Sequence, residues 1–272
     1  MIRPKSIERI VCSGGGAKGV VYPSSYKAMI DTGVYESAKE FSGASAGAIS
    51  AAMMAVGMSN ERFREQLLTT NFKELMGKTV TKKGPGVGVV GGRIITKTGL
   101  PLLEFIKKNL NESIQETLAQ IDETDLPRDA SLQQLFARIK NSSASELRIS
   151  FGDLGLLNHY FPQHFRQLTI PAVRFPNGEV QIFNSELTPD VEIALACRAS
   201  ASLPVILQPQ AISINGEEQL FVDGGLFDNL PTDYFDREAG SFVKNKKADQ
   251  TLVFAFGEGL DNNSCYAHKL VV

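Results

Sequence analysis

Cysteine is scarce in this chain, which has three, Cys12, Cys197 and Cys265, far apart among its 272 residues. An odd number of widely spaced cysteines argues against a disulfide framework and favours a reducing compartment. No group of histidines and cysteines has the spacing of a zinc site, and no run of carboxylates has that of a calcium loop. We therefore expect no metal and no other cofactor.

Long apolar runs are missing as well. Residues 1–7 contain no apolar core of the kind that a signal peptide needs, and no stretch approaches the roughly 20 apolar residues that cross a bilayer. The formal net charge of −2 provides no general attraction to nucleic acid. We expect a soluble protein with neither signal peptide nor transmembrane segment and with no nucleic-acid partner, which would act on membranes from their surface.

The chain also lacks internal repeats and low-complexity tracts. With 272 residues, 43% of them hydrophobic, it is long enough for one large domain with a sizeable core, so residues 1–272 are expected to form a single domain. The chain stops at Leu270-Val271-Val272 without a polar tail. We expect that a C-terminal region follows in the natural protein.

Strand and helix patterns alternate along the sequence, which predicts an α/β fold with a central, largely parallel sheet between helices. Strands are expected at 8–12, 40–42, 168–173, 180–183, 211–214, 219–222 and, as the last and a central one, 251–256. Helices are expected at 22–32, 48–56, 60–68 with Ser59 as its cap, 100–109, 114–121, 132–139 and 191–199. The turns at 176–178 and 215–216 predict two hairpins.

Two segments stand apart from this alternation. Residues 77–99 contain seven glycines and five basic residues, a composition typical of a mobile loop, and we interpret them as a flap near the site. A surface connection without function explains them equally well. Residues 100–148 are polar and helical and are expected to be an insertion that covers the site.

A serine stands at the centre of Gly43-Ala44-Ser45-Ala46-Gly47, between the expected strand at 40–42 and a helix rich in alanine and methionine. Such a pentapeptide predicts a sharp strand-to-helix turn, because glycines on both sides let helix and strand approach closely. Ser45 Oγ would then be exposed at a helix N-terminus, which favours developing negative charge. Taken alone, the motif fits a tight turn without catalysis about as well.

A loop of three successive glycines follows the first expected strand, in Gly14-Gly15-Gly16-Ala17-Lys18-Gly19. Its backbone N–H groups are unobstructed by side chains, so the loop suits either a phosphate cradle or an oxyanion hole. It has neither the G-x-G-x-x-G form nor the Lys-Ser/Thr pair of nucleotide-binding loops. A third motif, Asp223-Gly224-Gly225, places an aspartate at a strand end, where it either does chemistry or caps the turn.

With these three motifs in this order, the chain resembles the patatin-like phospholipases, over about residues 15 to 235. The resemblance implies a three-layer α/β fold in which Gly14, Gly15, Gly16 and Ala17 form the oxyanion loop, Ser45 is the nucleophile and Asp223 is its dyad partner. Lys18, Gly19, Gly43, Gly47, Gly224 and Gly225 would support these motifs. Two more blocks agree: 149–154, which is similar to the family's segment leading into a central strand, and 199–204, which ends in proline.

Within the family, the sequence is most similar to effectors that pathogenic bacteria such as Legionella inject into host cells. The resemblance implies hydrolysis of phospholipid or lysophospholipid esters through an acyl-enzyme intermediate. It also implies activation by a host protein such as ubiquitin or a small GTPase. The protein would then work in the host cytosol, peripherally bound to membranes.

Two alternatives stay open. An unperturbed aspartate has a pKa of about 3.9, so Asp223 needs its environment to raise that pKa, or the glycine loop must lower much of the barrier. The chain has three histidines; His159 and His164 belong to an aromatic, proline-bearing loop, while His268 follows Asp223 in the order of a Ser-His-Asp esterase. A catalytically silent scaffold that binds a host protein or a nucleotide is the alternative from another class.

Overall fold

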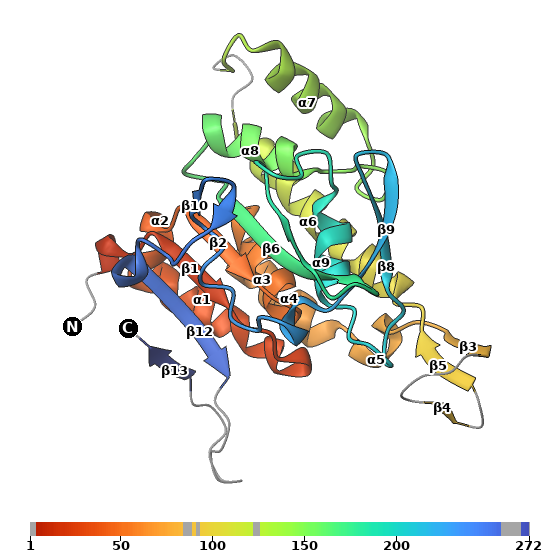
Figure 1. Ribbon diagram of the computed structural model, residues 1–272. Helices are drawn as coiled ribbons and strands as arrows, with labels where there is room; N and C mark the ends of the chain where they lie inside the picture. The colour runs from red at the N-terminus through yellow and green to blue at the C-terminus, as the bar shows by residue number, and fades with distance from the viewer. Residues whose placement is uncertain (1–3, 84–88, 91–92, 122–125, 257–267, 272) are drawn as a thin grey trace.

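A computed structural model describes residues 4–83, 89–90, 93–121, 126–256 and 268–271. Its centre is an eight-stranded sheet in the order β13-β12-β1-β2-β6-β9-β8, with β7 also paired to β6 (Figure 1). The strands are β1 (Arg9–Cys12), β2 (Glu40–Gly43), β6 (Gln167–Phe175), β7 (Val180–Phe183), β8 (Gln210–Ile214), β9 (Glu217–Val222), β12 (Thr251–Phe256) and β13 (His268–Val271). Helices flank this sheet, so the predicted α/β fold is confirmed.

Four adjacent strands, β12, β1, β2 and β6, run parallel and form the middle of the sheet. All four residues of β1 are buried, as expected of a strand covered by helices on both faces. Antiparallel strands extend the sheet on both sides, β13 next to β12, and β7 and β9 next to β6. The prediction that 251–256 is the last strand was wrong, because β13 follows it and pairs with it along four residues.

Two helices next to the sheet border the catalytic candidates: α3 (Ala46–Ala55) begins directly after Ser45, and α9 (Ile193–Ser200) packs beside it. Helix α1 spans Tyr22–Asp31. Helix α3 packs on β1, β2 and β6, and α9 packs on α3 and β6. Small residues make this close contact possible, since eight of the ten residues of α3 are buried and most of them are alanine, glycine or serine. The tight packing holds both helix ends that border the site.

The remaining helices are α2 (Val34–Ser37), α4 (Asn60–Thr69), α5 (Phe72–Leu75), α6 (Leu100–Leu118), α7 (Ala130–Asn141) and α8 (Phe151–Tyr160). Ser59 caps α4 by accepting a hydrogen bond from the Arg62 N–H, as predicted. Ser150 and Asp153 form a reciprocal capping box that starts α8. The block at 149–154 therefore opens a helix, and the central strand β6 follows only after that helix.

Residues 100–148 begin with a helix that belongs to the hydrophobic core. The two helices predicted at 100–109 and 114–121 are one continuous helix, α6, whose residues Ile106, Leu110 and Ile114 belong to the hydrophobic core. Helix α6 packs against both α3 and α9. The side chain of Asn111, a polar residue in its middle, donates to the Ala144 and Leu147 carbonyls and so is satisfied when buried. Helix α7 lies where the third helix was predicted.

The glycine-rich segment 77–99 contains strands where a loop was expected. Strands β3 (Thr79–Lys83), β4 (Val89–Val90) and β5 (Arg93–Lys97) form a separate antiparallel sheet, and residues 84–88 and 91–92 lie outside the described residues. The β-branched residues of β3 and β5 favour strands and outweigh the nearby glycines. The Lys97 N–H donates to the Ile206 carbonyl at 2.8 Å, which ties this sheet to the loop after α9.

Both predicted hairpins are present. Strands β6 and β7 pair across 176–178, and β8 and β9 pair across Asn215 and Gly216. Asn215 and Gly216 have φ values of 54° and 82°, the left-handed pair that a two-residue hairpin needs. The second hairpin positions Asp223 because β9 ends at Val222.

The remaining elements are short. The glycine loop continues into the 3₁₀ helix η2 (Gly16–Val21), and η4 (Gly224–Leu226) follows Asp223 directly. The others are η1 (Pro4–Ser6), η5 (Ala248–Gln250) and the strand pair β10 (Arg237–Glu238) and β11 (Ser241–Phe242).

Candidate active site

Ser45 occupies the turn between β2 and α3 with φ 55° and ψ −126°, in a region that side chains other than glycine seldom adopt. The flanking glycines make this turn possible. A Cβ on Gly43 would lie 2.3 Å from the Gly47 carbonyl oxygen, and a Cβ on Gly47 would lie 2.1 Å from the Cys12 carbonyl oxygen. Any other residue at either position would push α3 away from the sheet, so both glycines fix the place of Ser45.

Asp223 lies directly after β9 and is 3% exposed. Ser45 Oγ donates to Asp223 Oδ2 at 2.7 Å, and the Gly225 N–H donates to Asp223 Oδ1 at 2.7 Å. The backbone N–H of Asp223 donates to the Ser202 carbonyl at 3.0 Å. A Cβ on Gly224 would lie 2.2 Å from the Pro171 carbonyl oxygen, so this turn packs directly against β6. Both carboxylate oxygens of Asp223 therefore have fixed partners.

Burial raises the pKa of the Asp223 carboxyl above its usual range, while the hydrogen bonds from Ser45 and Gly225 act in the opposite direction. The raised pKa reflects the loss of hydration that a charged carboxylate suffers inside the protein. A carboxylate in these surroundings is a better proton acceptor than one in water. An aspartate that acts as a base needs such a raised pKa.

The glycine loop lies against Ser45. A Cβ on Gly14 would come within 2.9 Å of the Ser45 Cβ and 2.3 Å of Asn229 Oδ1. Asn229 holds this glycine at both ends, because the Gly14 N–H donates to the Asn229 carbonyl at 3.1 Å and Asn229 Nδ2 donates to the Gly14 carbonyl at 3.2 Å. Gly14 thus anchors the loop, and its N–H does not point to a substrate, in contrast to the expectation.

The next three N–H groups of the loop, those of Gly15, Gly16 and Ala17, have no hydrogen-bond acceptor among the described residues. Gly16 has φ 55°, which turns the chain into η2. A Cβ on Gly15 would lie 2.3 Å from the Phe256 ring, so this position also requires glycine. The loop thus carries up to three unpaired donors beside the serine.

The supporting residues Lys18 and Gly19 have different roles. The exposed Lys18 Nζ lies 5.9 Å from the centre of the Phe256 ring, at the distance of a cation–π contact. Gly19 is buried, and a Cβ there would lie 3.2 Å from the Ala46 Cβ, so η2 and α3 approach closely. Lys18 therefore lies over an aromatic ring and Gly19 is a packing residue.

Three polar residues that bind the candidates received no role from the sequence: Ser200, Ser202 and Asn229. Ser200 Oγ accepts the backbone N–H of Ser45 at 3.0 Å, and the Ser202 carbonyl accepts that of Asp223. The one available signal was their position: Ser200 and Ser202 lie inside the block 199–204, and Asn229 lies four residues after the Asp223-Gly224-Gly225 motif. The end of α9 therefore contacts both members of the Ser45–Asp223 pair.

Arg198 holds the end of α9 in place. It is 1% exposed, and its guanidinium donates to the carbonyls of Thr98, Gly99 and Gln208 and to Ser202 Oγ. Burial lowers the pKa of Arg198 to about 10. Since Gly99 begins α6, this side chain joins α6 to the turn that contacts Ser45 and Asp223.

None of the described histidine side chains contacts the pair. His159 lies exposed in the last turn of α8, where a loop was expected, and packs against Tyr160, while His164 follows that helix. His268 lies in β13 opposite Phe256, and its side chain is outside the described part of the chain. Within the described ranges, no three residues of the His, Cys, Asp and Glu types gather as metal ligands would, and no helix has the length and apolar character to cross a membrane.

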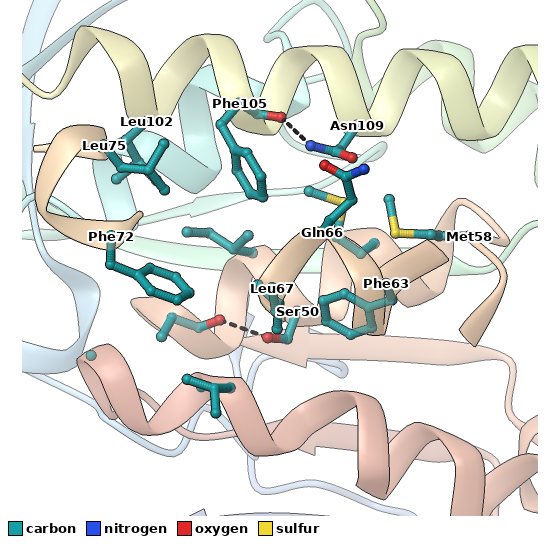
Figure 2. A pocket seen from close by; sticks show the side chains of 16 residues that line it. Ser50, Met58, Phe63, Gln66, Leu67, Phe72, Leu75, Leu102, Phe105 and Asn109 are labelled. Atoms are coloured by element: carbon teal, nitrogen blue, oxygen red, sulfur yellow. Dashed lines mark hydrogen bonds between the residues drawn. The ribbon is translucent and has the colours of Figure 1, made fainter. Parts of the chain in front are cut away.

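An apolar pocket begins beside Ser45 (Figure 2). Gly16, whose N–H is one of the unpaired donors, and Ala46, which follows Ser45, belong to its wall. Side chains from four helices, α3 to α6, line the rest: Ile49, Met53, Phe63, Leu67, Phe72, Leu75, Leu102 and Phe105. Figure 2 shows Phe72, Phe105 and Phe63 around this space, with the amides of Gln66 and Asn109 at one end. The lining of the pocket is therefore almost entirely apolar.

Known proteins have a similar fold. VipD from Legionella pneumophila has a similar fold, with a TM-score of 0.68, 19% identity and coverage of 91% of this chain and 49% of VipD. ExoU of Pseudomonas aeruginosa, solved in full length with SpcU from the type III secretion system, has a TM-score of 0.57 and 24% identity over 74% of this chain and 39% of ExoU. The chain thus spans half or less of these proteins, and the likeness shows the fold.

Sequence comparison agrees with the fold. The "Probable lipid hydrolase 463L" of Invertebrate iridescent virus 6 is 30% identical over 97 residues, which are 34% of this chain and 31% of that protein. The family model described as "Patatin-like phospholipase" matches residues 10–236, which include all three glycine motifs. The chain belongs to the patatin-like phospholipase family.

Proposed function

We propose that this protein is a lipid acyl hydrolase that cleaves a carboxylic ester of a phospholipid or lysophospholipid. Ser45 is the nucleophile and Asp223 its base in a dyad without histidine. The observation that carries this proposal is the hydrogen bond of 2.7 Å from Ser45 Oγ to Asp223 Oδ2. The family match and the viral lipid hydrolase relative support the class of reaction.

The first half of the reaction forms an acyl-enzyme. Ser45 Oγ attacks the ester carbonyl carbon while its proton passes to Asp223 Oδ2, and the carbonyl electrons move to the oxygen. That oxyanion accepts hydrogen bonds from the N–H groups of Gly15, Gly16 and Ala17, as in other acyl-transfer enzymes. Collapse of the intermediate breaks the ester bond, and the leaving alcohol takes the proton from Asp223. Ser45 then carries the acyl group.

The second half removes the acyl group with water. Asp223 accepts a proton from the water as the water oxygen attacks the acyl carbon, and it returns that proton to Ser45 Oγ when the fatty acid leaves. The acyl chain occupies the apolar pocket that begins at Gly16 and Ala46. Burial favours transfer of a proton to Asp223 from Ser45 or from water, because it raises the pKa of the Asp223 carboxyl above its usual range.

A Ser-His-Asp esterase fits the described site less well. In such a triad the aspartate accepts a hydrogen bond from the histidine, whereas the two oxygens of Asp223 accept from Ser45 and Gly225. A silent scaffold leaves unexplained why Ser45 is held at a positive φ against a buried carboxylate. A silent scaffold would show no turnover, whereas turnover that depends on His268 would distinguish a triad from the dyad.

We further propose that the protein acts at the membrane surface of a host cell and that a host protein, such as ubiquitin or a small GTPase, activates it. The fold shared with VipD and the type III effector ExoU supports this proposal. Such an activator would favour the loop conformation in which Gly15 and Gly16 donate to the oxyanion.

The test is hydrolysis of fluorescent phospholipid and lysophospholipid by the purified chain, with and without eukaryotic cytosol. We expect low activity alone and higher activity with cytosol, and we expect Ser45→Ala to abolish both. Release of fatty acid by Ser45→Ala at the wild-type rate would refute the mechanism. Full activity of the chain alone on pure vesicles would refute the activator but leave the dyad intact.

A further inference from the structure

Large exposed apolar side chains gather on three segments next to the site. One segment is η2, the second is the loop after α9, and the third is η4 with the residue that follows it. We call these side chains the apolar rim: Val20, Leu203, Val205, Ile206, Leu226 and Phe227. A soluble surface rarely clusters so many apolar groups without a binding role.

Backbone contacts tie each segment to the proposed catalytic groups. Leu203 follows Ser202, whose carbonyl accepts the Asp223 N–H, and the Leu226 N–H donates to the Asp223 carbonyl at 3.3 Å. Val20 lines the same apolar pocket as Gly16 and Ala46. The rim therefore borders the entrance to Ser45.

The side chains of the apolar rim are exposed, although large apolar side chains are usually buried. Phe227 is 70% exposed and Leu226 is 54% exposed, although neither has a polar tip. Val205 has φ 70°, where a β-branched residue is strained. Strain of this kind persists where the surrounding structure and a function require it. Exposure and strain together indicate that these side chains are held out for contact with an apolar partner.

We propose that the apolar rim inserts into the surface of a lipid bilayer, so that the entrance to the site opens onto the lipid. The proposal rests on the proposed lipid substrate, since an acyl chain then passes from the bilayer to the pocket without crossing water. A basic side chain, that of Lys18, is on η2, the same segment as Val20 of the rim. Cations at the edge of an inserted apolar group favour anionic lipids.

The chain has no tryptophan, so a single one reports on its own surroundings. We would introduce Phe227→Trp and, as a matched control, Leu68→Trp. Leu68 is equally exposed, at 70%, but lies on α4 in a surface depression with Lys27, Glu61 and Arg64. Both variants would carry Ser45→Ala so that the vesicles stay intact. The vesicles contain phosphatidylcholine and phosphatidylglycerol in equal amounts, with brominated acyl chains in a second preparation.

On addition of vesicles, the emission of Phe227→Trp should shift to shorter wavelength, and brominated chains should quench it. Leu68→Trp should change little. Unchanged emission of Phe227→Trp, or an equal response of Leu68→Trp, would overturn the proposal. A blue shift without quenching by brominated lipid would also overturn it, because the residue would then be covered by protein.

A second experiment removes the rim. We expect Leu226→Ser with Phe227→Ser, and separately Val205→Asn with Ile206→Ser, to weaken vesicle binding about tenfold or more per pair, with Leu68→Ser as the control. Asparagine tolerates the positive φ of Val205. Hydrolysis of a water-soluble short-chain ester should stay at the wild-type level in all of them. Unchanged vesicle binding of both pairs would refute insertion of the rim into the bilayer. If only Ser45→Ala loses hydrolysis of the soluble ester, the proposed function stands whatever the result for the rim.

Discussion

The backbone N–H of Ser45 donates to Ser200 Oγ at 3.0 Å, so the first amide of the α3 N-terminus is held by a side chain from the last turn of α9. Ser200 is fully buried and also lies under Gly224, where a Cβ would come within 3.1 Å of its Oγ. One hydroxyl therefore contacts the turn of the proposed nucleophile and borders the turn of the proposed base. Its loss should change their relative placement.

We expect Ser200→Ala to lower kcat on a soluble ester by about tenfold with little change in KM. The substitution leaves the partly buried Ser45 N–H without its acceptor, at a cost of up to about 1–3 kcal/mol, and frees the serine turn to shift. Steady-state kinetics together with urea unfolding separate the two effects. A loss of stability with wild-type kcat would mean that Ser200 is a packing residue only.

Ser45→Ala and Asp223→Asn should each reduce ester hydrolysis by at least about a thousandfold, and the double variant should be no worse than either single variant. A nucleophile and its base act as one unit, so removing the second adds nothing. His159→Ala and His164→Ala are the matched controls and should keep the wild-type rate. If His268→Ala loses turnover at normal thermal stability, a triad replaces the dyad.

Asn229→Ala should lower kcat about tenfold or more. The variant removes the Nδ2 donor that fixes the Gly14 carbonyl, so the loop with the Gly15, Gly16 and Ala17 donors loses an anchor. Misplacing a single oxyanion donor costs about 10²–10³ in rate. Asn177→Ala, in the exposed hairpin turn after β6, is the control. Equal kinetics of the two variants would show that the loop holds its shape without Asn229.

The raised pKa of Asp223 predicts a pH dependence of stability. Because burial favours the protonated form, the native state binds more protons than the unfolded chain in the window from the unfolded aspartate value, about 3.9, up to the raised native value. Unfolding free energy contributed by Asp223 therefore falls as pH rises through this window. Asp223→Asn should be more stable than the wild type above the window and lose that advantage below it.

Thermal unfolding of both proteins over a pH series measures this difference. The acid limb of kcat/KM should likewise lie above the pH at which an exposed aspartate titrates, because the base must be ionised in the free enzyme. If the melting temperatures of the wild type and Asp223→Asn differ by the same amount at all pH values, burial does not raise the pKa of Asp223.

Hydrolysis should survive a chelator at full rate, because the proposed mechanism stabilises the oxyanion with backbone donors alone. The measurement compares initial rates on a soluble ester with and without EDTA and with added calcium. Strict calcium dependence of the chemical step would contradict the assignment of these donors.

The three motifs were readable in the sequence because each depends on local chemistry. A glycine beside Ser45 or at positions 14–16 permits a close backbone approach, and the order of strands and helices follows from apolar periodicity. Both Ser45 and Asp223 could be named in this way, as could the α/β fold. The hairpins at 176–178 and 215–216 were equally local, since turn residues specify them.

The tertiary structure alone decided which groups meet. Ser45 and Asp223 are 178 positions apart, and they form their hydrogen bond because β9 pairs with β6 and β6 with β2. The same long-range packing brings Asn229 to Gly14. The Gly14 N–H donates to the Asn229 carbonyl and is therefore not one of the oxyanion donors. It also placed α6 in the core, because a polar-looking helix is buried when its few apolar residues face α3 and α9 and its polar ones find partners.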